Sequence, residues 1–186
     1  MERVQGLLLA AGAGRRMGMP KALKTDPDGT PWLRRAVEVL RAGGCGDVTV
    51  VLGACEGRSA PFAPDAHHVI CPDWSEGIGA SLAHGLRELT PRPGAAALVH
   101  LVDLPDVTAA VAQRLLTPRP GADSLRRAVY EGVVGHPVVI GRGHWRPLIE
   151  ELAGDRGANA YLRRHHAREI ECGDLASGRD VDSPQG

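Results

Sequence analysis

LLLAAGAGRRMGMPK, residues 7–21, opens with aliphatic side chains and runs through small residues into a segment of three glycines, two arginines and a lysine. A short apolar run bounded by glycine is typical of a buried strand in a parallel sheet, so residues 4–10 are predicted to be a strand. Residues 11–30 are predicted to be a long loop, closed by the turn signal PDGTP. This stretch raises the question of which ligand would need exposed backbone and several cations directly after a buried strand.

Outward from this loop, strand and helix patterns alternate along the first part of the chain, which favours βαβ units and a parallel sheet. We predict strands at 47–53, 67–71 and 95–103, and helices at 32–42, 75–89 and after Thr108, a candidate N-cap. Beyond 117–124 the pattern becomes irregular. Two short strands are predicted around Gly132 within 127–141, helical stripes at 145–152 and near 161–162, and an edge strand at 168–172.

The composition bounds the function. The chain has 186 residues, which suits one domain, and equal numbers of basic and acidic residues, 22 of each. Neutral charge and few aromatic residues (3%) argue against a nucleic-acid partner. No apolar run reaches the ~20 residues that span a bilayer, and the start MERVQG does not match a signal peptide. Four cysteines without a C-x-x-C pair favour a reducing, cytoplasmic setting over a zinc or disulfide site.

This loop partly matches two familiar phosphate-binding motifs. It fails as a Walker A loop, because Gly18 is followed by Met19. It also fails as a dinucleotide fingerprint, because Met17 stands where the third glycine belongs. Both are near misses, so neither motif assigns the ligand.

A loop that wraps a nucleoside triphosphate fits better. Gly12 and Gly14 would let backbone N–H groups approach phosphate oxygens. Arg16 would add a fork-shaped donor and Lys21 a point charge. The chain has only two lysines, Lys21 and Lys24, and both follow this loop. The alternative is a solvated loop with incidental arginines.

A carboxylate follows the predicted strand 95–103. Ligands of open α/β sheets bind beyond the carboxyl ends of the strands, where Asp103 stands, and a carboxylate there can hold Mg²⁺ against phosphates. The alternative is an aspartate that caps a turn. Asp106 is predicted only to cap the next helix.

Six segments, in order, resemble the MobA-like nucleotidyltransferases, which include the molybdenum cofactor guanylyl- and cytidylyltransferases. LAAGAGRRMGMPK resembles their signature loop L-A-[AG]-G-x-[SG]-x-R-[ML]-G-x-x-K, and LVDLPDVT resembles their D-x-P strand end. The other segments are PDWSEGIGASLAHGL, GHPVVIG, GDRGANAYL and DVDSP. Two of the matches depart from the family pattern: Cys71-Pro72-Asp73 precedes Trp74, and Ser183 replaces threonine.

The resemblance implies a three-layer α/β/α fold with a mostly parallel, Rossmann-like sheet of the nucleotide-diphospho-sugar transferase type. It implies one domain, 1–186, with a nucleotide-binding half (1–116) and an acceptor-binding half (117–186). Arg16, Lys21 and Asp103 would be catalytic, Asp103 and Asp182 would bind metal, and His136 and Asp155 would bind the acceptor. The nucleotide-binding set would be Leu9, Ala10, Ala11, Gly12, Gly14, Arg16, Lys21 and Ser81.

The expected reaction is transfer of a nucleoside monophosphate from an NTP to a phosphorylated acceptor, with Mg²⁺ or Mn²⁺ as the metal and release of pyrophosphate. Ala11 gives the loop the LAAG form of the cytidylyltransferase branch. This form favours CTP over GTP as the nucleotide, and it favours molybdopterin as the acceptor. A molybdoenzyme or a chaperone would be a fitting partner. The alternatives are a transferase acting on 2-phospholactate or methylerythritol phosphate, an NAD-dependent oxidoreductase, and a non-catalytic nucleotide-binding module.

Overall fold

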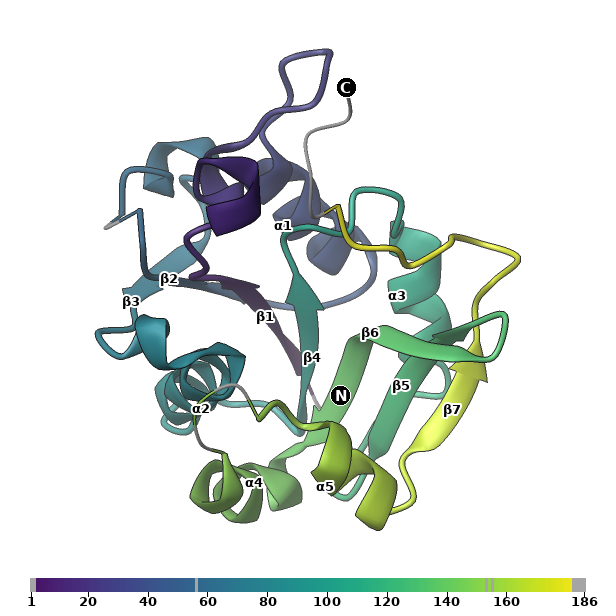
Figure 1. Ribbon diagram of the computed structural model, residues 1–186. Helices are drawn as coiled ribbons and strands as arrows, with labels where there is room; N and C mark the ends of the chain where they lie inside the picture. Colours follow the sequence, from purple (N-terminus) through teal and green to yellow (C-terminus); the bar gives the residue numbers. More distant parts are fainter. Residues whose placement is uncertain (1–2, 56, 153, 155, 182–186) are drawn as a thin grey trace.

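The computed structural model describes residues 3–55, 57–152, 154 and 156–181 (Figure 1). Within them the strands form one seven-stranded sheet of order β3-β2-β1-β4-β6-β5-β7. The strands are β1 (Val4–Ala10), β2 (Val48–Leu52), β3 (His67–Ile70), β4 (Ala96–Leu101), β5 (Leu125–Tyr130), β6 (Val133–Gly141) and β7 (Arg168–Glu171).

The sheet is mostly parallel, as predicted. β1 pairs in parallel with β2 and β4, β2 with β3, and β5 with β7. Among the described strands, β6 alone runs the other way, pairing antiparallel with both β4 and β5. Because β6 joins β4 to β5, the regular first part of the chain and the irregular second part share one sheet.

Helices cover both faces of the sheet and make three layers (Figure 1). On one face α1 (Trp32–Ala42) and α3 (Ala109–Leu115) bury Leu33, Leu40 and Leu115 against the strands. On the other face lie α2 (Ile78–Leu89), α4 (Trp145–Glu151) and α5 (Asn159–Arg164), which bury Leu86 and Leu148. The central strand β1 is buried along its whole length, because helices exclude water from both of its faces.

The strand and helix predictions agree with the structure to within a few residues, with local exceptions. The predicted helix 75–89 begins at Ile78, because residues 74–76 form a 3₁₀ turn and Gly77 (φ 128°) breaks the helical path. Thr108 stands at the N-cap of α3, yet its side chain makes no capping hydrogen bond. The expected capping role of Asp106 is wrong, since its carboxylate binds Ser177 far along the chain.

No helix in the described ranges is both long and apolar enough to cross a membrane.

Candidate active site

The strand order creates a crevice at the carboxyl ends of β1 and β4. From β1 the chain moves through α1 on one face to β2, and from β3 it returns through α2 on the other face to β4. The segments that follow β1 and β4 therefore diverge, and this reversal is where open α/β sheets bind ligands. A cavity of about 440 Å³ lies there.

The long loop after β1 forms the roof of this cavity. Gly14 (φ 59°) and Gly18 (φ 72°) adopt the left-handed conformation on either side of a 3₁₀ turn, Arg15–Met17. A side chain on Gly14 would place its Cβ 2.0 Å from the carbonyl oxygen of Met19, so glycine is required there. Met17 is buried in the core and anchors the turn. The loop is thus a built structure rather than a solvated connection.

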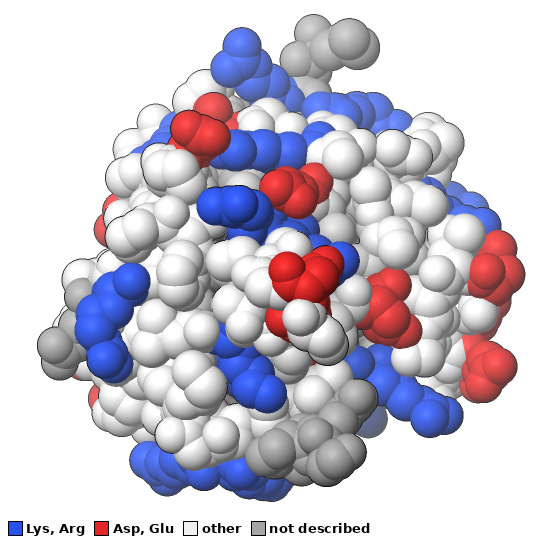
Figure 2. Space-filling model, turned by 90° about the horizontal axis from the view of Figure 1, so that it is seen from above, with Lys and Arg blue, Asp and Glu red and all other residues white. Residues whose placement is uncertain are grey.

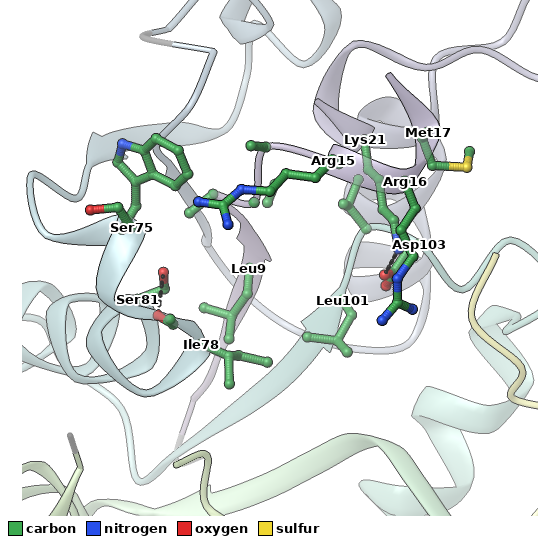
Figure 3. A pocket seen from close by; sticks show the side chains of 18 residues that line it. Leu9, Arg15, Arg16, Met17, Lys21, Ser75, Ile78, Ser81, Leu101 and Asp103 are labelled. Atoms are coloured by element: carbon green, nitrogen blue, oxygen red, sulfur yellow. Dashed lines mark hydrogen bonds and ion pairs between the residues drawn. The ribbon is translucent and has the colours of Figure 1, made fainter. Parts of the chain in front are cut away.

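The same turn sends its two arginines in different directions. Successive side chains of a 3₁₀ turn are about a third of a revolution apart. Met17 takes the inward direction, which leaves Arg15 and Arg16 exposed on separate sides. Figure 3 shows Arg15 reaching across the cavity toward the segment of Ser75, whereas Arg16 lies beside Lys21 and Asp103.

Lys21 and Asp103 form the charged centre of the site. The Lys21 Nζ donates to Asp103 Oδ2 at 2.7 Å, and each side chain is 16% exposed. Lys21 begins a second 3₁₀ turn, Lys21–Leu23, which the buried Ala22 holds against the core. Asp103 lies two residues beyond the end of β4. The two sequence-predicted catalytic groups are therefore in contact.

The second carboxylate oxygen of Asp103, Oδ1, is not bound by Lys21. It is buried and has no hydrogen-bond partner among the described residues. A buried charged oxygen without a partner is costly, and a hard divalent cation is a ligand that would satisfy it. Asp103 therefore fits a Mg²⁺ or Mn²⁺ site. In the described part of the chain, no group of three His, Cys, Asp or Glu side chains that could hold a metal ion is found.

The opposite wall comes from the segment before α2. Trp74 packs directly over Gly53, where an added Cβ would lie 2.5 Å from the indole, and it lines the cavity. The Ser81 hydroxyl donates to the Gly77 carbonyl at 3.4 Å from a buried position on α2. Leu9, Ile78 and Leu101 put aliphatic side chains below the loop (Figure 3).

The structure brings together all the residues predicted for nucleotide and catalysis. Leu9, Ala10, Ala11, Gly12, Gly14, Arg16, Lys21, Ser81 and Asp103 all line the one cavity. Sequence reasoning missed Arg15, Trp74, Ser75 and Ile78, which line it too. No sequence signal separates Arg15 from Arg16, because the 3₁₀ turn that directs them apart is seen only in the structure.

The predicted acceptor and second metal residues are placed differently. His136 does not line the cavity. It lies partly buried on β6, where burial lowers the pKa of its imidazole to about 4. His136 precedes a cis proline, and its carbonyl accepts from the Tyr130 hydroxyl at 2.6 Å. Asp155 and Asp182 lie outside the described residues.

The surface around the crevice carries both signs of charge. Figure 2, which looks onto this end of the sheet, shows basic and acidic side chains close together in the middle of the face. Such a mixed surface suits an anionic ligand bound together with a divalent cation.

The fold and the crevice define a class of protein. An open α/β sheet with a glycine- and cation-rich loop facing a carboxylate is the arrangement of enzymes that handle nucleoside phosphates. The model of the MobA-like NTP transferase domain matches residues 6–169, and the chain belongs to this family. It is a nucleotidyltransferase by class.

Known relatives cover nearly the whole chain. A nicotine blue oxidoreductase from Paenarthrobacter nicotinovorans is 35% identical over 97% of this chain and 92% of its own length. The crystal structure of Rv0371c from Mycobacterium tuberculosis superimposes with a TM-score of 0.81 at 28% identity, covering 98% and 93% of the two chains. Rv0371c has also been crystallised as a complex with manganese (TM-score 0.76, 26% identity, 96% and 94% covered).

A nucleotidyl transferase from Methanothermobacter thermautotroptrophicus has the same fold, with a TM-score of 0.79 at 19% identity over 97% and 92% of the two chains. The predicted fold is confirmed: three α/β/α layers with a mostly parallel sheet of the nucleotide-diphospho-sugar transferase type.

Proposed function

We propose that the protein transfers a nucleoside monophosphate, CMP in preference to GMP, from an NTP to a phosphorylated small molecule such as molybdopterin, with release of pyrophosphate. The observation that carries the proposal is the 2.7 Å contact between Lys21 and Asp103 beneath the glycine loop. It puts a cation that can bind phosphate and a carboxylate that can bind metal side by side in the cavity where a triphosphate would lie.

Each part of the cavity has a role in this reaction. Gly12 and Gly14 line the cavity, and their backbone N–H groups would bind phosphate oxygens. Lys21 and Arg16 would stabilise the negative charge that develops on the leaving pyrophosphate. The acceptor phosphate would attack the α-phosphorus in line, so the protein acts by positioning its substrates and neutralising charge.

The metal would be held by Asp103, through the oxygen that Lys21 does not occupy. Bound there, Mg²⁺ or Mn²⁺ would neutralise phosphate charge and orient the triphosphate. The manganese complex of Rv0371c supports a divalent cation in this family fold. We propose Asp182 as a second ligand, because Val181 donates its N–H to the Asp103 carbonyl and Asp182 follows directly.

The choice of base and of acceptor rests on a few single residues. Ala11 lines the cavity where guanylyltransferases tend to have glycine, which favours a pyrimidine. Ser81 and the main chain near it would contact the base or ribose. His136 and Asp155 are proposed for the acceptor side, and 2-phospholactate and methylerythritol phosphate are the alternative acceptors. Four buried free thiols suit reaction in the reducing cytoplasm.

A thermal-shift series tests the proposal first. CTP, GTP, ATP, UTP and NADH would each be added with and without Mn²⁺, since a ligand that binds the folded state raises its stability. We expect the largest metal-dependent shift with CTP. Pyrophosphate release in the presence of molybdopterin would then demonstrate transfer.

The relative named nicotine blue oxidoreductase favours a second candidate, an enzyme that reduces a small dye-like molecule. The same loop would then hold the pyrophosphate of a dinucleotide, although the third glycine of that fingerprint is replaced by Met17. Metal-independent stabilisation by NADH, with NADH oxidation in the presence of a dye acceptor, would establish this function in place of transfer.

A further inference from the structure

The last described segment of the chain returns to the candidate active site. Residues 173–181, here called the C-terminal strap, leave β7 at the edge of the sheet and run back toward the end of β4 (Figure 1). At its far end Val181 donates its N–H to the carbonyl oxygen of Asp103 at 3.1 Å. The strap is thereby bonded to the backbone of the proposed metal ligand.

Asp106 holds the middle of the strap. Its Oδ2 accepts two hydrogen bonds of 2.6 Å each, one from the N–H and one from the hydroxyl of Ser177. Two bonds on one carboxylate oxygen are charge-assisted and fix both position and orientation. Asp106 stands three residues after Asp103 on the same loop, so this loop and the strap are joined at two points.

Tyr130 supplies a platform beneath the strap. Gly178 (φ 63°) packs against its ring, where an added Cβ would lie 2.2 Å from two ring carbons. The Tyr130 hydroxyl donates to the His136 carbonyl at 2.6 Å. Glycine at this position therefore lets the strap pass in contact with the buried ring before it reaches Asp103.

We propose that Asp106 is a positioning residue that clamps the strap, and through the Val181 hydrogen bond fixes the Asp103 backbone for binding of a divalent cation. Groups that orient metal ligands commonly matter about tenfold or more to metal affinity. The inference rests on the proposed function only in that Asp103 binds a metal; it does not depend on nucleotide transfer.

Mn²⁺ binding to the full chain tests this, measured by electron paramagnetic resonance of free Mn²⁺. Asp106→Ala should raise the Mn²⁺ Kd about tenfold. Asp106→Asn keeps an oxygen that accepts both bonds and should stay within about threefold of the wild type. The matched control is Asp47→Ala, an exposed aspartate before β2 at the opposite end of the sheet, which should leave the Kd unchanged.

Amide exchange supplies a second readout. The N–H groups of Ser177 and Val181 should exchange faster in Asp106→Ala than in the wild type, while amides of β1 keep their protection. Ser177→Ala loses one of the two bonds and should give an intermediate Kd, which serves as the test if Asp106→Ala does not fold.

Three results would overturn the clamp: an unchanged Mn²⁺ Kd in Asp106→Ala, an Asp106→Asn variant as weak as Asp106→Ala, or a wild type that binds no Mn²⁺. The second would mean that the charge of Asp106 acts rather than its hydrogen bonds. A wild type that binds Mn²⁺ but transfers no nucleotide would refute the proposed function and leave the clamp supported by the Kd pattern.

Discussion

The Lys21 ammonium lies 2.7 Å from a carboxylate oxygen of Asp103, although 82 residues separate the two in the chain. Both are largely shielded from solvent, where an ion pair is stronger than on an open surface. One partner comes from the loop after β1 and the other from the segment after β4. The pair therefore joins the two strands whose ends form the crevice.

Replacement of this lysine should damage turnover more than binding. In Lys21→Ala, kcat should fall by about 10²–10³, because the lost charge matters most when pyrophosphate leaves. The Kd for the nucleotide should change less than about tenfold. Steady-state kinetics together with calorimetric titration would measure both quantities.

Lys24→Ala is the matched control for that experiment, since it removes the only other lysine of the chain. Lys24 places its Nζ 5.1 Å from the centre of the Trp32 ring and does not line the cavity. Its turnover should stay within about twofold of the wild type, given the modest strength of exposed cation–π contacts. Full activity in Lys21→Ala would contradict the assigned role.

Neutralising Asp103 should remove the metal. Asp103→Asn keeps the size of the side chain but takes away the charge that a hard cation requires, so the Mn²⁺ Kd should rise about 100-fold. Calorimetric titration of Mn²⁺ would measure it, with Asp65→Asn as control because that aspartate pairs with Arg41 on the surface, away from the cavity and the strap. A Mn²⁺ titration identical to the wild type would place the metal elsewhere.

Two glycines of the loop should respond differently to alanine. Gly12 has open space around its Cβ position, so Gly12→Ala should change the free energy of unfolding by less than about 0.5 kcal/mol. It should nevertheless weaken nucleotide binding, because the new methyl group would occupy the approach of a phosphate. Gly14→Ala should cost about 3 kcal/mol or more, since it strains a left-handed residue and forces the new Cβ against the Met19 carbonyl oxygen.

Chemical denaturation and nucleotide titration of the two variants would separate these effects. Normal nucleotide affinity in a folded Gly12→Ala protein would mean that phosphates do not approach the loop at this glycine.

Buried histidines should make the protein sensitive to acid. His100 is 1% exposed on β4, and burial lowers its pKa to about 3. The unfolded chain then binds the proton more tightly than the folded one. Stability is therefore complete above about pH 6.5 and falls as the pH is lowered toward 3, by about 1.4 kcal/mol per pH unit for this histidine.

Urea unfolding between pH 7 and pH 4 would measure that slope. His100→Leu should reduce the pH dependence of the free energy of unfolding by the contribution of about one proton. His67→Gln, at an exposed position on β3, should leave it unchanged. An equal slope in wild type and His100→Leu would show that the acid sensitivity arises elsewhere.

The loop residues could be predicted well from sequence because local chemistry fixes them. A buried strand followed by Gly12, Gly14 and several cations indicates a loop that binds phosphate, and periodicity identified the strands and helices around it. The antiparallel direction of β6 and the contact of Asp106 with Ser177 could not be predicted. Both depend on which distant segments pack together, and no local pattern encodes that choice.

The sequence by itself determined the α/β layers, the family, and the kinds of group in the site: small residues, cations and a strand-end carboxylate. Only the tertiary structure decided that Lys21 meets Asp103, that Arg15 crosses the cavity while Arg16 does not, and that the C-terminal strap returns to β4. The physical reason is that residue type and spacing set local conformation. Contacts between distant residues depend on the strand order and on the packing that excludes water between the layers.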